Sequence, residues 1–244
     1  MRMPPRVVMP ELLDELDPED PRARRSRADL RHVHRLMGSV SVLEAAIRRL
    51  QLAAQPRRIL ELGAGDGSLL LRLGRALPHW GGIDLTLLDR HDLLSQETRE
   101  SYGKLGWTVT MLRADALSWA SEEHSTIHFD LCIANLFLHH FASEPLVTLM
   151  AAIQRTSDAF IACEPRRNTF ARLGSRLVGL LGANSVTRED AVKSVRAGFS
   201  HEELTSLWSG PEGGWLCEEY SAPPFTHCFT AVRASARQGE SRDG

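Results

Sequence analysis

The feature that most constrains the fold of this chain is a glycine-rich turn placed directly after a short apolar run. Residues 58–62 read Arg-Ile-Leu-Glu-Leu, and residues 63–67 continue Gly-Ala-Gly-Asp-Gly. Leucines follow at helical spacing from Leu69, and Pro78 ends that helix. A buried strand, a tight glycine turn and a helix in this order are typical of a parallel α/β sheet that binds a ligand at the turn.

The rest of the chain repeats this alternation of strands and helices. We expect further strands at 83–88, 107–112, 129–134 and 159–163, with helices at 92–105 and around 146–153 between them. The last two strands, at 215–220 and 226–232, are joined by a short Ser-Ala-Pro-Pro turn, so they must pair antiparallel. The chain is therefore expected to be an α/β three-layer sandwich whose sheet is mostly parallel with an antiparallel end.

The segments outside this core differ in composition and periodicity. The N-terminus is rich in proline and charge with little periodicity, whereas the next segment carries an amphipathic helical pattern that Gly38-Ser39 divides. The predicted organisation is a flexible leader over 1–25, an N-terminal helical cap over 26–56, a catalytic domain over 57–234 that contains a helical lid insertion at 165–199, and a flexible tail over 235–244.

Composition excludes several function classes. The 244 residues carry a formal net charge of −2, whereas binding to nucleic-acid phosphates favours an excess of lysine and arginine. The four cysteines form no Cys-x-x-Cys pair, which fits a reducing cytoplasm. No run approaches the roughly 20 apolar residues that cross a bilayer. We therefore expect a cytoplasmic protein with neither a nucleic-acid nor a membrane partner.

The glycine turn departs from two common nucleotide motifs. A dinucleotide fingerprint reads G-x-G-x-x-G, but position 68 is Ser and Gly67 comes one residue early. The turn also lacks the G-K-[ST] ending of a phosphate-binding loop. Asp89 ends the second expected strand, about 20 residues after the glycines, where a carboxylate can bind both ribose hydroxyls of a nucleoside.

Two further motifs follow the third and fourth expected strands. Asp115 lies in the run Arg-Ala-Asp-Ala directly after the third strand, where it could instead only cap the next helix. Asn135 ends the fourth strand and precedes the run Leu-Phe-Leu-His-His-Phe. Open α/β sheets place their ligands at the carboxyl ends of the strands, so both residues are candidates for a binding site.

These four ordered motifs, from residue 57 to about residue 165, resemble the class I, Rossmann-like, S-adenosylmethionine-dependent methyltransferases, whose first motif reads acidic-x-G-x-G-x-G. The resemblance implies a seven-stranded sheet of order 3-2-1-4-5-7-6 with strand 7 antiparallel, and S-adenosyl-L-methionine as the cofactor. In that family the Asp after the third strand binds the adenine amino group. The cofactor-binding residues implied here are Glu61, Gly63, Ala64, Gly65, Gly67, Asp89, Arg90, Asp115, Ala116, Asn135 and Leu136.

Two shorter runs are similar to a bacterial subgroup that acts on phenol- or polyketide-type small molecules. They are His34-Arg35-Leu36-Met37-Gly38 and Glu164-Pro165-Arg166-Arg167. The resemblance implies methylation of a hydrophobic or aromatic small molecule in secondary metabolism, with the acceptor held by the helical cap and the lid insertion. A hydroxyl oxygen is the expected acceptor atom. The alternatives are a carbon or nitrogen acceptor, or a subunit that binds the cofactor without catalysis.

His139 and His140 are the candidates for a catalytic base that removes the acceptor proton, because neutral imidazole titrates near working pH. Consecutive residues of a regular element cannot both face one pocket, so at most one is expected to act chemically. Metal-dependent relatives need carboxylates after the fourth strand, and residues 135–141 contain none. The histidines also lack the spacing of metal ligands. The reaction is therefore expected to be independent of a metal.

Overall fold

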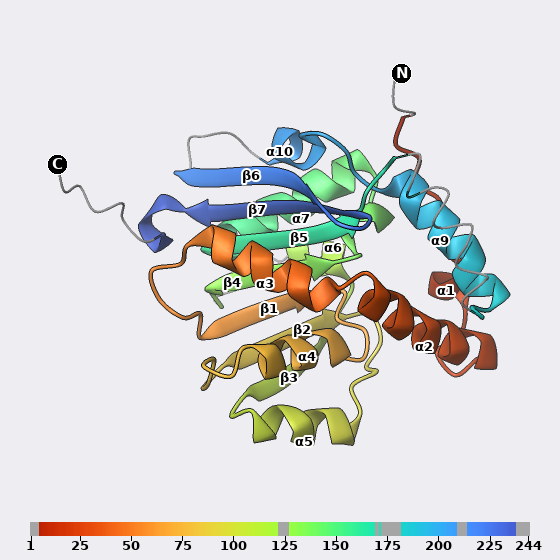
Figure 1. Cartoon of the computed structure of the whole chain (residues 1–244), viewed down its shortest axis with the longest axis horizontal. Coiled ribbons are helices and arrows are strands. Elements are labelled where there is room, and N and C mark those ends of the chain that lie inside the picture. The colour runs from red at the N-terminus through yellow and green to blue at the C-terminus, as the bar shows by residue number, and fades with distance from the viewer. Residues whose placement is uncertain (1–4, 122–126, 169–170, 172–181, 209–213, 238–244) are drawn as a thin grey trace.

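The computed structural model describes residues 5–121, 127–168, 171, 182–208 and 214–237. Its strands are β1 (Arg58–Leu62), β2 (Asp84–Asp89), β3 (Thr108–Arg113), β4 (Leu131–Asn135), β5 (Ala159–Pro165), β6 (Trp215–Ala222) and β7 (Thr226–Arg233). They form one seven-stranded sheet of order β3-β2-β1-β4-β5-β7-β6 (Figure 1). Strands β1 to β5 pair in parallel, and β7 pairs antiparallel with both β5 and β6. The predicted strand order and the antiparallel seventh strand are confirmed.

Helices cover both faces of this sheet, which confirms the three layers (Figure 1). One face carries α3 (Ser39–Leu50), α4 (Ser68–Ala76) and α5 (Gln96–Lys104), and the other carries α6 (Ala116–Ser121), α7 (Ser143–Thr156) and α10 (Glu203–Leu207). Three more helices, α1 (Leu12–Glu15), α2 (Pro21–Leu36) and α9 (Ser185–Ala197), lie beyond the carboxyl ends of the parallel strands. Two 3₁₀ turns complete the described elements, η1 (Leu138–His140) and η4 (Ala234–Ala236).

Neighbouring residues of each central strand enter opposite cores, because successive side chains of a strand point to opposite faces. Ile59 of β1 packs under α3 and α4, whereas Leu60 packs under α6 and α7. Strand β5 divides in the same way between Ile161 and Phe160. Every residue of β4 and β5 is buried. Two buried layers of apolar side chains therefore hold the carboxyl ends of the strands at one rigid edge.

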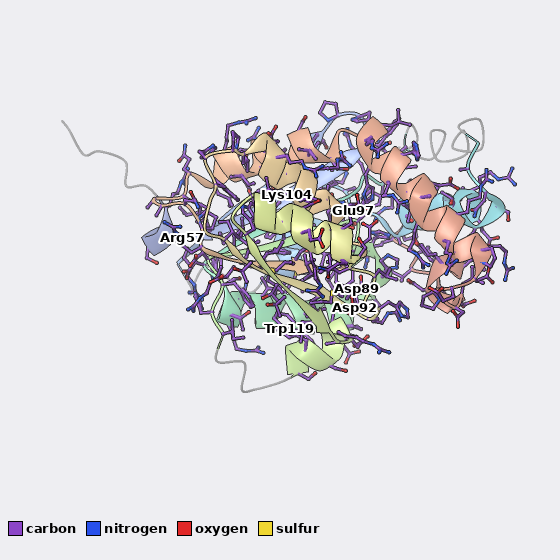
Figure 2. All side chains as sticks on the ribbon, turned by 90° about the horizontal axis from the view of Figure 1, so that it is seen from below. Arg57, Asp89, Asp92, Glu97, Lys104 and Trp119 are labelled. Carbon is purple, nitrogen blue, oxygen red and sulfur yellow. The ribbon has the colours of Figure 1, made fainter. Side chains whose placement is uncertain are left out.

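The loops at that edge are separated from the opposite edge by the full length of the strands. Figure 2 shows Asp89 and Asp92 near the carboxyl end of β2 and Arg57 at the far end of the molecule. Helix α5 begins at Gln96, later than the predicted residue 92, because the side chain of Ser95 accepts a hydrogen bond from the Thr98 amide and caps the helix there. The extra residues form a loop beside the carboxyl end of β2.

The N-terminal segment, which we define as residues 5–20, is not the flexible leader predicted from its composition. The amides of Leu12 and Leu13 donate to the two carboxylate oxygens of Asp190 in α9, at 2.8 and 3.0 Å. Arg6 donates to the carbonyl oxygens of Phe141 and Ala197, each at 2.7 Å. Helix α2 begins at Pro21, after an Asp20 cap. Arg6, Glu11 and Asp14 of this segment therefore each contact a residue that is distant in the sequence.

The C-terminal boundary and the lid also differ from the prediction. Residues 234–237 are not part of a free tail, since the Ala236 carbonyl accepts the Ala53 amide at 3.0 Å and Arg237 donates to Gln51. Within the predicted lid insertion at 165–199, residues 169–170 and 172–181 lie outside the described residues. The rest of the predicted insertion contains α9, which Asn184 caps. In the part of the chain that the structure describes, no helix has the length and apolar character needed to cross a membrane.

Candidate functional site

The glycine turn between β1 and α4 requires glycine for two different reasons. Gly63 and Gly65 have φ angles of +66° and +56°, in the left-handed region that side chains rarely adopt. A Cβ at Gly63 would also lie 2.2 Å from the Phe137 ring, whereas a Cβ at Gly65 would meet nothing within 4 Å. The turn thus lets the loop after β4 approach the end of β1 while the backbone at Gly65 stays open toward the site.

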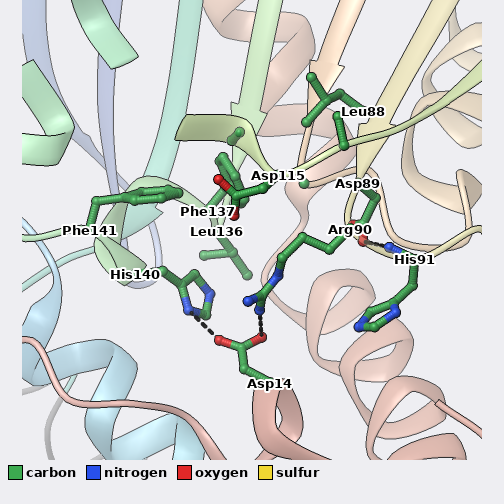
Figure 3. Close-up of a pocket in the computed structure, with 13 residues that line it drawn as sticks. Asp14, Leu88, Asp89, Arg90, His91, Asp115, Leu136, Phe137, His140 and Phe141 are labelled. Carbon is green, nitrogen blue, oxygen red and sulfur yellow. Dashed lines mark hydrogen bonds and ion pairs between the residues drawn. The ribbon is translucent and has the colours of Figure 1, made fainter. Parts of the chain in front are cut away.

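Asp89 links this turn to the end of β2. Its carboxylate accepts the Gly65 amide at 2.9 Å through one oxygen and the His91 amide at 3.0 Å through the other (Figure 3). The side chain is therefore held at the rim of the turn, where its remaining lone pairs can accept hydrogen bonds from two neighbouring hydroxyls. This is the position that the sequence predicted for it.

Asp115 both caps a helix and lines a cavity of the candidate site. One of its carboxylate oxygens accepts the amides of Leu117 and Ser118, at 2.9 and 3.1 Å, and so caps α6. The cap that the sequence left open as an alternative is therefore present. Its carboxylate nevertheless lies in the wall of a cavity shared with Asp89 (Figure 3).

Two neighbouring cavities bring together most of the predicted cofactor residues. The outer cavity, of about 270 Å³, is lined by Gly63, Asp89, Arg90, Asp115, Ala116 and Leu136 among others. The inner cavity, of about 250 Å³, is lined by Glu61, Ala64, Gly65, Asn135, His139 and His140 among others. Gly67 lies in neither wall and instead caps α4, where its carbonyl oxygen accepts the Tyr102 hydroxyl at 2.6 Å.

The inner cavity is lined by two residues with a buried polar atom that makes no hydrogen bond to the described residues. Among the described residues, Glu61 Oε2 and Asn135 Nδ2 are buried and make no hydrogen bond. Burial raises the pKa of Glu61 well above its usual value, and the charges of Asp66 and Asp89 raise it further. Buried unpaired polar atoms are costly. A ligand that carries both a cationic and an anionic group at one end would satisfy both atoms.

The two candidate histidines have different environments. His139 is buried, and its Nδ1 donates to Glu164 Oε2 at 2.7 Å. The other Glu164 oxygen accepts the amides of Phe137 and Leu138, at 3.0 and 2.8 Å, so one carboxylate fixes the whole turn η1. Burial alone would lower the pKa of His139, but hydrogen bonds and charge from Glu11 and Glu164 outweigh it and raise the pKa to about 9.

His140 is partly exposed and faces the N-terminal segment. Its Nδ1 lies 3.1 Å from Asp14 Oδ2, and the other Asp14 oxygen lies 3.2 Å from Arg90 (Figure 3). Burial favours the neutral carboxyl of Asp14, yet the hydrogen bond from His140 and the charge of Arg90 hold its pKa below the usual value. Arg90, predicted to contact the cofactor, thus also forms an ion pair with Asp14, and both residues line the outer cavity.

Sequence reasoning missed three acidic residues of the site, namely Glu11, Asp14 and Glu164. Glu11 and Asp14 belong to a segment whose composition suggested a leader, and no local motif marks them. Glu164 lies near the carboxyl end of the buried strand β5, as Asp89 lies at the end of β2, and this pattern was the available signal. All three lie within hydrogen-bonding or ion-pairing reach of the histidine pair.

A third cavity, of about 210 Å³, lies between α2 and α9 and has a mainly apolar wall. Leu30 and Val33 of α2, with Met37 directly after it, line this cavity together with Ala191 and Val195 of α9. It shares Glu11, Leu136 and Pro165 with the inner cavity, so the two adjoin beside the histidine pair. We call it the apolar cavity. Its helices are those that the sequence assigned to acceptor binding, α2 from the cap and α9 from the insertion.

Known protein families agree with the motifs. The family described as a methyltransferase domain matches residues 59–158, which contain the glycine turn, Asp89, Asp115 and the histidine pair. A search of curated proteins found no match.

Solved structures share the fold at low sequence identity. The plantazolicin methyltransferase BpumL, in complex with SAH, is 15% identical, with a TM-score of 0.63 over 88% of this chain and 91% of that one. The mitomycin 7-O-methyltransferase MmcR is 20% identical, with a TM-score of 0.55 over 91% of this chain and 60% of that one. An O-methyltransferase family protein from Burkholderia thailandensis is 17% identical, with a TM-score of 0.54 over 91% and 62%.

Proposed function

We propose that this chain, whose residues 59–158 match a methyltransferase-domain family and whose sheet has the class I strand order, is an S-adenosylmethionine-dependent methyltransferase. We propose further that it transfers the methyl group to a hydroxyl oxygen of a hydrophobic or aromatic small molecule. The observation that carries this proposal is the apolar cavity, which adjoins the inner cavity beside His139 and His140. Concave sites with apolar walls and a few convergent polar groups are typical of small-molecule binding. A role in secondary metabolism follows from the same acceptor class.

The residues present fit the cofactor in both cavities. In our proposal Asp89 accepts the ribose hydroxyls and Asp115 with Ala116 reads the adenine, while Glu61 and Asn135 bind the methionine end. The unpartnered atoms Glu61 Oε2 and Asn135 Nδ2 support this assignment, because an ammonium and a carboxylate supply the missing hydrogen bonds. When bound, S-adenosylmethionine supplies an electrophilic methyl group, whose bond to sulfur breaks, leaving the electron pair on sulfur, as the bond to the acceptor oxygen forms.

The protein must hold the acceptor in line with the methyl group and remove the hydroxyl proton. Glu11 lines both the inner cavity and the apolar cavity and lies beside His139, so we place proton removal at this end of the inner cavity. Glu164 fixes the turn that carries both histidines, and Asp14 stands beside His140. The apolar walls of α2 and α9 orient the acceptor and exclude water from it.

The test is methyl transfer to two matched probes, 4-hexylphenol and 4-hexylaniline, with mass fragmentation of the products. We expect transfer to the phenol oxygen. Transfer confined to nitrogen or to a ring carbon contradicts the hydroxyl assignment. Absence of transfer to either probe, by protein that binds S-adenosylhomocysteine, contradicts the hydrophobic acceptor and favours a subunit that binds the cofactor without catalysis.

A pair of variants locates the acceptor. Ala191→Phe places a ring in the apolar cavity, whereas Val192→Phe adds the same ring at the next position of α9, outside that wall. We expect Ala191→Phe to abolish transfer while S-adenosylhomocysteine binding persists, and Val192→Phe to transfer normally. Equal activity of the two variants contradicts this location.

A further inference from the structure

We propose that Glu11, His139 and His140 form a binding site for one divalent transition-metal ion of the Zn²⁺ type at the end of the inner cavity. One carboxylate oxygen of Glu11 and one ring nitrogen from each histidine all lie within 4.8 Å of one another. All three residues line the same cavity. Two histidines and one glutamate, with a fourth position left for water or substrate, are a donor set of catalytic zinc.

The surroundings of His139 are those of a metal-ligating imidazole. Such an imidazole almost always donates its second ring N–H to a carboxylate or carbonyl, which fixes its orientation. Here Nδ1 donates to Glu164 at 2.7 Å, and the backbone amides of η1 hold Glu164 in turn. Nε2 of His139 is thereby aimed at Glu11, from the opposite side of the ring.

The distance between His139 and Glu11 favours an ion between them. Nε2 lies 3.4 Å from Glu11 Oε1, whereas a charge-assisted N–H···O⁻ hydrogen bond is usually about 2.7–2.9 Å long. Two ligands bound to zinc at about 2.0–2.2 Å in tetrahedral geometry stand roughly 3.4 Å apart. The two atoms are therefore spaced as metal ligands, and binding of the ion displaces the imidazolium proton of His139.

His140, the remaining proposed ligand, and the Glu11 carboxylate each contact another polar side chain. The rings of His139 and His140 lie side by side, with centroids 4.3 Å apart, and Asp14 stands 3.1 Å from His140 Nδ1. The Ser194 hydroxyl donates to Glu11 Oε1. A polar partner is thus present beside each of the three ligands, as the outer contacts of a metal site require.

This assignment changes the expectation of a metal-independent reaction, which rested on the absence of a carboxylate among residues 135–141. The carboxylate comes instead from the N-terminal segment, which no motif connects to the histidines. Resting on the proposed function, the catalytic consequence is that the acceptor oxygen occupies the fourth position. The ion stabilises it as an anion, and its proton passes to solvent.

The experiment is a titration of the untagged full chain with Zn²⁺ by calorimetry, and with Co²⁺ by visible absorption, which reports four-coordinate geometry. We expect one ion per chain with micromolar or tighter affinity. Glu11→Gln and His140→Gln should each weaken binding by at least about 10-fold, because each removes a ligand. The control variants Glu15→Gln and His32→Gln change exposed residues of α1 and α2 and should bind as the wild type does.

Two results overturn the metal site. One is no stoichiometric binding by folded wild-type protein, and the other is unchanged binding in both ligand variants, which places the ion elsewhere. Circular dichroism confirms that each variant is folded. S-adenosylhomocysteine is titrated into the same samples. If the protein binds S-adenosylhomocysteine but no metal, only the metal site is rejected. If it binds the metal but not S-adenosylhomocysteine, the proposed function is rejected and the metal site is supported.

Discussion

The two halves of the candidate site are built in different ways. The half that we propose for the cofactor, called the cofactor half, consists of the glycine turn after β1, Asp89 at the end of β2 and Asp115 after β3. The half that we propose for the acceptor, called the acceptor half, joins the N-terminal segment, α2, α9 and the turn η1, which are distant in sequence. Local motifs identify the residues that strand order alone positions. They do not identify charged residues that come together from segments distant in the sequence.

The acceptor half depends on paired charges to a degree that the cofactor half does not. Glu164, which is fully buried, accepts three backbone amides and the ring of His139. Asp190 accepts two amides of the N-terminal segment. In the cofactor half the carboxylates of Asp89 and Asp115 accept backbone amides, and neither is paired with a buried imidazolium within the described part of the chain. Removing one charged side chain should therefore destabilise the acceptor half more than the cofactor half.

Glu164→Gln should cause the largest loss of stability, about 3–5 kcal/mol, because it removes the closer and fully buried of the two carboxylates, Glu164 and Glu11, that pair with the imidazolium of His139. Urea denaturation measures the loss. Glu218→Gln, which removes an exposed partner of Arg49, should cost less than about 1 kcal/mol. Folded Glu164→Gln protein should still bind S-adenosylhomocysteine. If both variants lose equally, or if cofactor binding disappears with the acceptor half, the proposed division is wrong.

A smaller effect is expected where the halves touch, at Gly63 and Phe137. Gly63→Ala combines an unfavourable positive φ with a collision with Phe137 and should cost about 3 kcal/mol. Gly65→Ala has the same backbone strain without a neighbour within 4 Å and should cost about 1 kcal/mol. Thermal unfolding of the two variants without ligand measures the difference. Similar losses would show that the ring contact does not couple the halves.

The smallest effect concerns His34 of α2, which faces the inner cavity. Burial, assisted by the charge of Arg72, lowers its pKa to about 4. Since the unfolded chain binds this proton near pH 6.5, stability is complete above that pH and falls as the pH drops toward 4. Between pH 7 and pH 5 we expect a loss of about 1–2 kcal/mol from this group, discounted for its partial exposure.

The measurement is denaturant unfolding at both pH values. His34→Asn should remove this part of the pH dependence, whereas His32→Asn, at an exposed position of the same helix, should keep it. A pH dependence in His34→Asn equal to that of the wild type would show that His34 is not buried in its neutral form.

The alternation of strands and helices predicted a mostly parallel sheet, and the resemblance to class I methyltransferases implied its strand order and the residues that now line two adjoining cavities. These residues follow strands whose burial the apolar runs reveal, so topology brings them together. Gly67 is the exception, since its role is to end the turn and begin α4. The cytoplasmic location remains a prediction.

The acceptor half could not be predicted in the same way. The composition of residues 1–25 matches a solvated segment, and only the fold shows that Arg6, Glu11 and Asp14 each meet a partner from another element. The sequence placed the two histidines together without distinguishing them. Their difference arises from Glu164, which engages His139 and leaves His140 to the N-terminal segment.

The most direct test of the account is calorimetric titration with S-adenosylmethionine and S-adenosylhomocysteine of the wild type, Asp89→Ala and Asp84→Ala. Asp84 begins the strand that Asp89 ends, so it controls for the loss of a carboxylate from β2. We expect micromolar binding of both ligands, weakened at least about 100-fold in Asp89→Ala, where two charge-assisted hydrogen bonds are lost, and unchanged in Asp84→Ala. Equal affinity in the two variants, or no binding by folded wild-type protein, would contradict it.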